Sequence, residues 1–358
     1  MPGELGDERM KAWVLYGVKD IRQEEIPRPL PAPDEVLVQV KAVGICGSDI
    51  PRIYQTGAHR HPLVPGHEFS GVVVETGEHV RDDWNGKRVG VFPLIPCKKC
   101  IPCRNKQYEM CRNYNYLGSR RDGAFAEYVA VPADNLVELP PEVSFEEAAM
   151  LEPMAVAVHA MRKIVPETKQ MVAVCGLGTI GLLLVMFLRE KGIKNILVIG
   201  NKEFQKNQVQ KLGVSEEYYC DSKTTDVSKW IMTQTEGAGV DVFFECVGKN
   251  DTVLQAIDTV APAGEICLVG NPYSDIKLDK NVYWKILRNQ LTIVGTWNSS
   301  FTQEAKDDWN YVLGKLAKGL ISPAELISHR FSLQELETGF HIMRDKTEDY
   351  VKVMCVNT

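Results

Sequence analysis

The pattern of hydrophobic and polar positions divides the chain into two regions of different character. Up to about residue 150, short apolar stretches are separated by prolines and glycines. Residues 36–43 are typical, because Gln39 and Lys41 alternate with valines as a half-buried strand requires. Residues 71–75 and 88–92 are two more predicted strands. Short strands with such breaks favour a barrel-like, β-rich unit.

From about residue 169, strands and helices are predicted to alternate. Residues 171–175 are apolar, a glycine-containing turn follows, and the apolar sequence LLLVMFLREK after it predicts a helix. Further strands are predicted at 196–199, 240–245, 265–269 and 291–294, with helical stretches between them. This alternation indicates an α/β unit whose doubly wound parallel sheet is covered on both faces. Residues 350–356 form a last predicted strand, which could rejoin the first region.

Composition narrows the class of protein. The chain has 358 residues, enough for two domains, and its net charge of −6 argues mildly against nucleic acid as a partner. No apolar run reaches the roughly 18 residues of a membrane span, and residues 1–9 lack the apolar stretch of a signal peptide. Ten cysteines without such a signal favour a cytoplasmic location, where thiols bind metal or pack in the core.

A cluster of four cysteines predicts a structural zinc site. Its members are Cys97, Cys100, Cys103 and Cys111. Thiolates at this spacing can converge on one tetrahedral zinc, and a closed four-sulfur shell is typical of structural sites. The alternatives are disulfides or buried thiols. Lys98, Lys99 and Arg104 indicate an exposed loop instead, so we predict zinc.

A glycine motif lies between the apolar run and the apolar helix, in the context of a dinucleotide-binding turn. It reads Gly176-Leu177-Gly178-Thr179-Ile180-Gly181. In such a turn the first glycine permits the bend, the second lets the backbone approach a pyrophosphate, and the third lets helix and strand pack closely. The helix N-terminus offers N–H groups to the phosphates. The alternative is a glycine-rich turn of another α/β protein.

The end of the second strand of this region bears on the choice of cofactor. An acidic residue there would bind the 2′-hydroxyl of NAD. This chain instead has Gly200-Asn201-Lys202, with Lys206 one turn later. A cation in place of a carboxylate suits a 2′-phosphate, so the local chemistry predicts NADP(H) over NAD(H). The alternative is that Lys202 is a solvated surface charge.

A second metal site is predicted from residues farther apart. Cys46 and Ser48 lie in one motif, His67 and Glu68 in another, and Glu152 farther on. One cysteine, one histidine and one or two carboxylates can bind zinc while leaving a position open for water or substrate. A lone cysteine or histidine is usually structural, but here both occur together with the four cysteines and the glycine motif.

Taken in order, these motifs resemble the zinc-dependent medium-chain dehydrogenase/reductase family. They are C-G-S-D at 46–49, G-H-E at 66–68, the four cysteines, E-P at 152–153 and G-L-G-T-I-G at 176–181. The resemblance implies a GroES-like catalytic domain at 1–159 and 297–358, with the zinc lobe at 94–114. A Rossmann domain at 160–296 would interrupt it, with the active site in the cleft between the two. It also implies homodimers or homotetramers.

Three stretches, at 46–59, 93–97 and 117–128, resemble the polyol branch of this family, and most of all its galactitol-1-phosphate 5-dehydrogenases. This resemblance implies Cys46 and His67 as ligands of the catalytic zinc, and leaves open whether Glu68 or Glu152 joins them. The histidine of the family's proton relay is missing here, so Ser48, a zinc-bound water and a glutamate must carry the proton. The resemblance favours NAD, against the local chemistry.

Further site residues follow from family position. Cys246-Val247 and Val269-Gly270 end strands where the nicotinamide half should lie, and Lys352 could reach the pyrophosphate. A substrate phosphate would need a cation. The candidates are Arg52, His59, Arg120 and Arg121. Any of them could instead be solvated, and one of the adjacent pair could bind Asp122. Trp297 could line the substrate pocket, or belong to the core or a subunit interface.

The resulting prediction is an oxidoreductase with two zinc ions per subunit, one catalytic and one structural. It would transfer a hydride between a secondary alcohol of a polyol or polyol phosphate, such as galactitol 1-phosphate, and a nicotinamide cofactor. Sorbitol, butanediol or threonine are alternative substrates. A non-enzymatic dinucleotide-binding protein is disfavoured, because an open metal site has little structural use.

Overall fold

The computed structural model describes residues 8–272 and 274–357, and these form two compact units. Unit 1 comprises Met1–Glu152 and Ser300–Thr358, and unit 2 comprises Pro153–Ser299. Helix α4 (Leu151–Lys163) runs across the first boundary. The boundaries predicted from sequence, 159/160 and 296/297, remain a prediction about functional domains.

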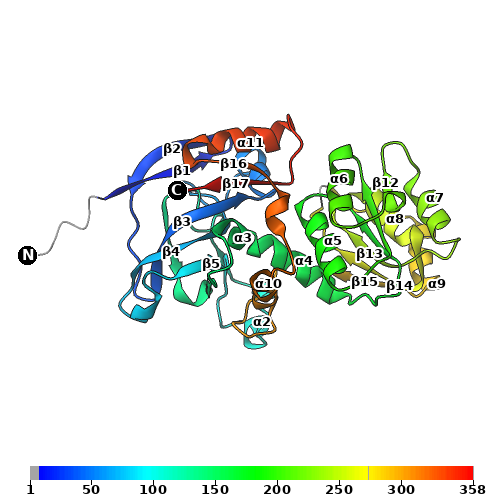
Figure 1. Ribbon diagram of the computed structural model, residues 1–358, viewed down its shortest axis with the longest axis horizontal. Helices are drawn as coiled ribbons and strands as arrows, with labels where there is room; N and C mark the ends of the chain where they lie inside the picture. The colour runs from blue at the N-terminus through cyan, green and yellow to red at the C-terminus, as the bar shows by residue number, and fades with distance from the viewer. Residues whose placement is uncertain (1–7, 273, 358) are drawn as a thin grey trace, which may run out of the picture. The chain divides into compact units, whose positions relative to one another are not determined.

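Unit 1 is built on a sheet of seven strands (Figure 1). Its main path runs β16 (Ile327–Phe331), β17 (Lys352–Val356), β3 (Glu35–Ile45), β4 (Glu68–Thr76), β5 (Arg88–Val91) and β9 (Leu136–Glu138), and β8 (Tyr128–Pro132) pairs with β3. The strands predicted at 36–43, 71–75 and 88–92 are therefore confirmed. So is the return of the chain end, because β17 pairs antiparallel with β3.

Smaller elements complete unit 1. They are the hairpin β1 (Arg9–Gly17) and β2 (Asp20–Pro27), the short pair β6 (Leu94–Ile95) and β7 (Asn115–Tyr116), and helices α1 (Asp49–Pro51), α2 (Ile101–Arg104), α3 (Phe145–Ala149), α10 (Asp308–Ala317) and α11 (Leu336–Asp345). Three aromatic side chains meet in its core. The ring centroid of Phe340 lies 5.9 Å from that of Trp13 and 5.4 Å from that of Phe125. Burial of these large apolar side chains stabilises the β-rich unit.

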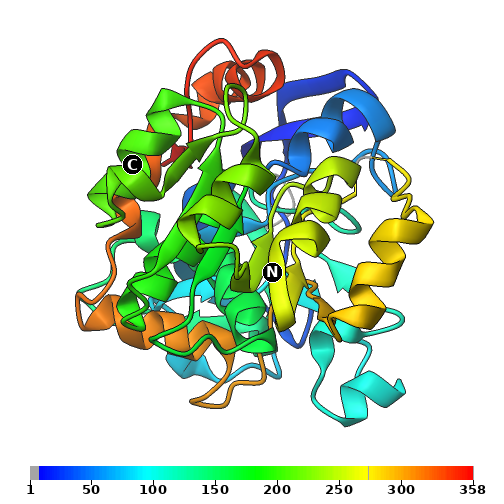
Figure 2. The same cartoon turned by 90° about the vertical axis from the view of Figure 1, so that its right-hand side faces the viewer.

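Unit 2 is a six-stranded parallel sheet with helices on both faces (Figure 2). The strand order is β12 (Tyr219–Asp221), β11 (Ile196–Gly200), β10 (Val172–Cys175), β13 (Val240–Glu245), β14 (Val260–Leu268) and β15 (Thr292–Gly295). The helices are α5 (Thr179–Glu190), α6 (Glu203–Lys211), α7 (Val227–Gln234), α8 (Asn250–Thr259) and α9 (Lys280–Arg288). In chain order the sheet reads 3-2-1-4-5-6, the doubly wound order of dinucleotide-binding folds. The predicted α/β class is confirmed.

The sequence of α5 explains its position. Its residues 181–188 are all buried, as expected of a helix that is apolar on every side.

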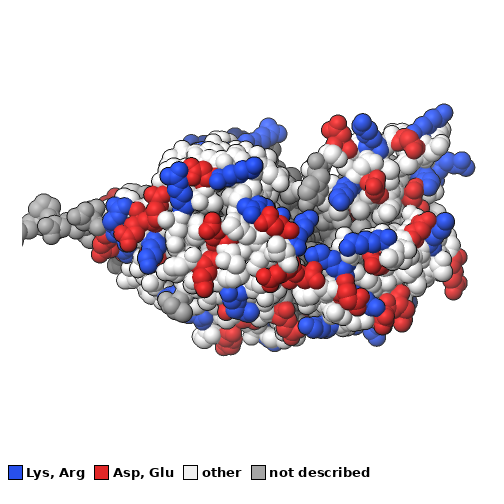
Figure 3. All heavy atoms as spheres, turned by 90° about the horizontal axis from the view of Figure 1, so that it is seen from above, with Lys and Arg blue, Asp and Glu red and all other residues white. Residues whose placement is uncertain are grey.

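Within the described ranges, no helix has both the length and the apolar character needed to cross a bilayer. Acidic and basic side chains are interspersed over the face shown in Figure 3.

Candidate functional site

Two antiparallel strands bring the residues of the predicted reactive metal site together in unit 1. Cys46 directly follows β3, His67 directly precedes β4, and Gly44 pairs with Glu68 across the two strands. The Cys46 sulfur, a His67 ring nitrogen and a Glu68 carboxylate oxygen lie within 4.8 Å of one another. A side chain at Gly44 would overlap the Glu68 carboxylate, so this close approach requires glycine. We call these three residues the ligand group.

A buried carboxylate, that of Asp49, contacts two residues of the ligand group. Asp49 is fully buried, accepts a hydrogen bond from the Cys46 N–H at 3.0 Å and an ion pair from Arg52, and lies 3.6 Å from His67 Nδ1. Burial opposes its ionisation, but His67 and Arg52 hold the pKa of Asp49 below its ordinary value. His67 Nδ1 is buried with no hydrogen-bond partner among the described residues. A buried donor set with an unsatisfied imidazole nitrogen fits a bound metal ion.

Lys352 is paired with a residue of the ligand group. Its Nζ forms a 2.5 Å ion pair with Glu68 and a 3.4 Å hydrogen bond to the Ile45 carbonyl oxygen. Both charged side chains are 2% exposed. Burial disfavours the ammonium, but Glu68 and Cys46 raise the pKa of Lys352 above its ordinary value. The amine is thus engaged inside unit 1, and its contact with a cofactor pyrophosphate stays a prediction.

Glu152 lies beside the ligand group but is held differently from Glu68. Its carboxylate accepts a 3.3 Å hydrogen bond from the Tyr116 hydroxyl, and the Tyr116 ring lies 5.6 Å from the His67 ring. Burial raises the pKa of Glu152 to about 7. Ser48 is also close, since its N–H donates to the Cys46 sulfur at 3.5 Å. Sequence reasoning did not single out Tyr116, and its position in the chain gave no signal.

The four predicted zinc cysteines converge in the loop around α2, which we call the cysteine lobe (residues 97–111). Their sulfurs lie within 4.8 Å of one another, and the shortest separation, between Cys100 and Cys103, is 3.4 Å. That distance is too long for a disulfide, and all ten cysteines, which lie in the described ranges, are free thiols. Backbone N–H groups of Arg112 and Cys103 lower the pKa of Cys100 to about 6. The lobe can therefore bind a structural zinc.

The glycine motif of unit 2 has the geometry of a phosphate-binding turn. Gly176 has φ +97°, which favours glycine. A Cβ at Gly181 would overlap the Gly176 carbonyl oxygen, whereas one at Gly178 would meet nothing within 4 Å. Gly178 is the N-cap of α5. Open space at the N-terminus of a buried helix fits a pyrophosphate.

Two further turns lie next to each other at the ends of β13 and β14. A Cβ at Gly248 would overlap the Asn271 carbonyl oxygen, which shows how closely the predicted segments 246–247 and 269–270 approach. The buried carboxylate of Glu245 fixes the first turn, accepting hydrogen bonds from Val247 N–H at 2.9 Å and Thr252 Oγ1 at 2.7 Å. Sequence reasoning did not single out Glu245, although a charged residue ending an apolar strand was a usable signal.

At the end of β11, the two predicted cations differ. Lys206 forms a 2.6 Å ion pair with Glu216. Lys202 is the N-cap residue of α6, and its carbonyl oxygen accepts a 3.0 Å hydrogen bond from the Tyr219 hydroxyl. Asn201 N–H donates to Gln205 Oε1 at 2.9 Å.

The substrate candidates are only partly brought together. Burial and the charges of Arg120 and Arg52 lower the pKa of His59 in unit 1. Arg121 instead binds Glu35 at 2.6 Å and the Ala130 carbonyl oxygen at 3.1 Å. Trp297 belongs to unit 2 and is 56% exposed. Asp122, considered a partner for the arginine pair, binds Arg60.

The chain matches two protein-family models. Residues 32–141 match the alcohol dehydrogenase GroES-like domain, and residues 179–318 match the zinc-binding dehydrogenase domain. The galactitol 1-phosphate 5-dehydrogenase of Escherichia coli (strain K12) is 31% identical over 318 residues, which cover 89% of this chain and 91% of that protein. The chain belongs to the zinc-dependent medium-chain dehydrogenase/reductase family. It is a nicotinamide-dependent dehydrogenase that acts on alcohols.

Solved structures of other dehydrogenases share the whole fold. The crystal structure of galactitol-1-phosphate dehydrogenase from Escherichia coli has a TM-score of 0.90 and 31% identity, covering 97% of this chain and 100% of that one. A zinc-binding dehydrogenase from Sinorhizobium meliloti 1021, bound to NADP, has a TM-score of 0.89 and 29% identity, covering 98% and 100%. The GroES-like and Rossmann-like architecture of this dehydrogenase is thereby confirmed.

Proposed function

We propose that this dehydrogenase transfers a hydride between a secondary alcohol of a polyol or polyol phosphate and NADP(H). A substrate like galactitol 1-phosphate would yield the corresponding keto sugar phosphate. The convergence of Cys46, His67 and Glu68 carries the proposal, since these donors suit an open zinc site. The name of the Escherichia coli relative supports a phosphorylated polyol.

Two zinc ions per subunit are proposed, one in the cysteine lobe and one at the ligand group. Glu68 is the favoured third ligand of the catalytic ion, because a carboxylate oxygen of Glu68 lies within 4.8 Å of the Cys46 and His67 donor atoms. When bound, the catalytic zinc acts as a Lewis acid on the substrate oxygen.

The residues around the ligand group would hold and move the hydroxyl proton. Tyr116 donates to Glu152 and fixes its orientation. A carboxyl whose pKa is about 7 can take up or release a proton near neutral pH. Ser48, next to Cys46, replaces the missing relay histidine in passing the proton outward. The hydride itself moves between the substrate carbon and the nicotinamide.

A turnover screen tests this function. Galactitol, sorbitol, butanediol and threonine, together with galactitol 1-phosphate and sorbitol 6-phosphate, would be followed by nicotinamide absorbance with both cofactors, with and without a chelator. We expect chelator-sensitive oxidation of polyols or their phosphates. Turnover confined to threonine or butanediol would contradict the proposed substrate class, and turnover of no alcohol would contradict the function.

The choice of NADP(H) leads to a prediction about Lys202. Lys202→Ala should raise the KM for NADP about tenfold, as expected for loss of a charged contact to the 2′-phosphate, and should leave the KM for NAD unchanged. The NADP-bound relative supports this choice. Lys211→Ala, which removes an exposed lysine from the last turn of α6, is the matched control. A wild-type enzyme that uses both cofactors equally, or prefers NAD, would show the inference to be wrong.

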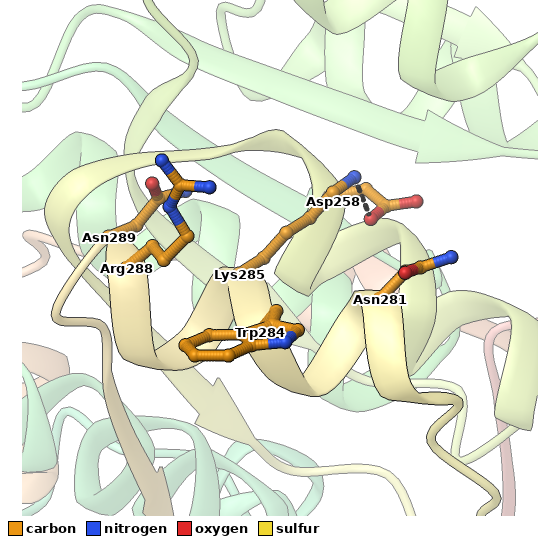
Figure 4. A pocket seen from close by; sticks show the side chains of 6 residues that line it. All are labelled: Asp258, Asn281, Trp284, Lys285, Arg288 and Asn289. Carbon is orange, nitrogen blue, oxygen red and sulfur yellow. Dashed lines mark hydrogen bonds and ion pairs between the residues drawn. The ribbon is translucent and has the colours of Figure 1, made fainter.

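An exposed apolar surface on unit 2 supports a homodimer or homotetramer. Strand β15 is an edge strand, and Ile293 on it is 37% exposed. On α9, Tyr283, Trp284 and Leu287 are about half exposed, and Trp284 lines a cavity of about 690 Å³ (Figure 4). Within the described residues β15 ends the sheet, and an edge strand together with exposed aromatic side chains on the same unit is typical of an interface; a second copy is the proposed occupant.

Sedimentation measurements test this assembly. Ile293→Glu should convert the oligomer to monomers, because a charge would be buried at the edge of β15. Leu320→Glu changes an exposed leucine of unit 1 and should leave the mass unchanged. A monomeric wild-type protein would contradict the proposal.

A further inference from the structure

Arg120 of unit 1 is connected to the ligand group through two aromatic rings. The Tyr116 ring lies 5.6 Å from the His67 ring and 6.2 Å from the Tyr114 ring, and the Arg120 guanidinium lies over Tyr114 at 4.7 Å. The aromatic pair thus links the ligand group to Arg120. A ligand that reaches both must extend beyond the group bound near His67.

The guanidinium of Arg120 is held in a fixed orientation, but one of its hydrogen-bond donors has no partner among the described residues. Its ring contact fixes the plane of the guanidinium, and the backbone N–H of Arg120 donates to the Tyr116 carbonyl oxygen at 2.9 Å. Its Nε is buried and has no hydrogen-bond partner among the described residues. Leaving such a donor unpaired costs about 1–3 kcal/mol, a cost that a bound acceptor would offset.

Neighbouring carboxylates are engaged elsewhere. Asp122 binds Arg60 at 2.8 Å and the Val64 N–H at 2.9 Å. Asp49 is shared by Arg52 and the Cys46 N–H. Among the described residues no acidic side chain forms an ion pair with Arg120. Positive charge is therefore in excess at this place.

The local field acts on a third group, His59. Burial and the charges of Arg120 and Arg52 lower the pKa of this exposed imidazole. The positive charges of both arginines therefore act on the His59 imidazole. An anion would relieve the repulsion among the three groups and could accept a hydrogen bond from the unpaired Arg120 Nε.

We infer that Arg120 and His59, assisted by Arg52, form a subsite for the phosphate monoester of the substrate. This inference rests on the proposed function and narrows it from polyols to phosphorylated polyols. Because ring contacts lead from His67 through Tyr116 and Tyr114 to Arg120, we expect the phosphate to be attached away from the reacting alcohol. Arg121, with its guanidinium bound to Glu35 and Ala130, has no part in the subsite.

Kinetics of Arg120→Gln test the subsite. The kcat/KM for galactitol 1-phosphate should fall about 10- to 100-fold, the range for losing one charge-assisted hydrogen bond. The kcat/KM for galactitol and the KM for NADP should change less than about threefold. Arg112→Gln, which removes an exposed arginine just beyond the cysteine lobe, should change none of these values.

Two further measurements keep the test independent of how Arg120→Gln folds. His59→Gln should lower the same kcat/KM selectively. Inorganic phosphate should inhibit the wild-type oxidation of galactitol competitively, with weaker inhibition in either variant. An equal loss for galactitol and its phosphate, no inhibition by phosphate, or a rise confined to the KM for NADP would overturn the subsite. If the wild type oxidises plain polyols as well as their phosphates, the subsite is wrong while the proposed function stands.

Discussion

Replacing Cys46 by alanine is expected to reduce kcat by at least about a thousandfold, because the Lewis acid that polarises the substrate oxygen would lose a thiolate ligand. Cys46 is one of three residues whose donor atoms lie within 4.8 Å of one another. Without its sulfur, only one imidazole and one carboxylate remain in the ligand group. Elemental analysis should accordingly find the metal content reduced from two zinc ions per subunit to one.

The matched control for this variant is Cys220→Ala. Cys220 is a buried thiol of unit 2, and burial raises its pKa to about 11, so that it packs as a neutral side chain. This control should keep both metal ions and most of the turnover. Full turnover in Cys46→Ala, with the metal content unchanged, would contradict the proposed catalytic site.

Alanine substitutions at two glycines of the glycine motif should have different effects, one on stability and the other on cofactor binding. Gly181→Ala should lower the free energy of unfolding by about 3 kcal/mol, because its Cβ would overlap the Gly176 carbonyl oxygen within the core of unit 2. Thermal unfolding followed by circular dichroism would measure this loss. Cofactor binding should weaken as a consequence of the distorted turn.

Gly178→Ala is the counterpart that separates binding from folding. A Cβ at this position meets no atom within 4 Å, and the backbone has φ −80°, so the variant should unfold at the wild-type temperature. The added methyl group would occupy the space in which a pyrophosphate approaches the backbone, and the Kd for NADP should rise about tenfold or more. Unchanged cofactor affinity in Gly178→Ala would show that the pyrophosphate binds elsewhere. Unchanged stability in Gly181→Ala would show that the turn can relax.

The strands at 36–43 and 196–199 and the apolar helix α5 were predictable, since each is encoded by a local periodicity or an apolar run. The cysteine lobe was predictable too. Its four cysteines lie so close together in the sequence that their spacing alone indicates that the sulfurs can meet at one metal ion. Local encoding also explains why the glycine motif could be assigned to a strand–turn–helix unit.

Long-range partners could not be predicted. Lys352 was expected at a cofactor, but it is paired with Glu68, 284 positions away in the chain. Arg121 was a candidate for substrate binding, but its guanidinium is bound to Glu35, 86 positions away. Tyr116, which holds Glu152 and lies next to His67, had no local pattern to mark it.

The sequence by itself determined the family, the two kinds of unit, and the residue types that can bind metal and dinucleotide. These properties follow from residue chemistry and short-range spacing. Only the tertiary structure decided which charges are neutralised and which remain available. The fold placed an ammonium on Glu68 and a carboxylate on Arg121, and left Arg120 without an acidic partner among the described residues. The energy of a buried charge depends on its neighbours in space, and in this fold many of those neighbours are far apart in the chain.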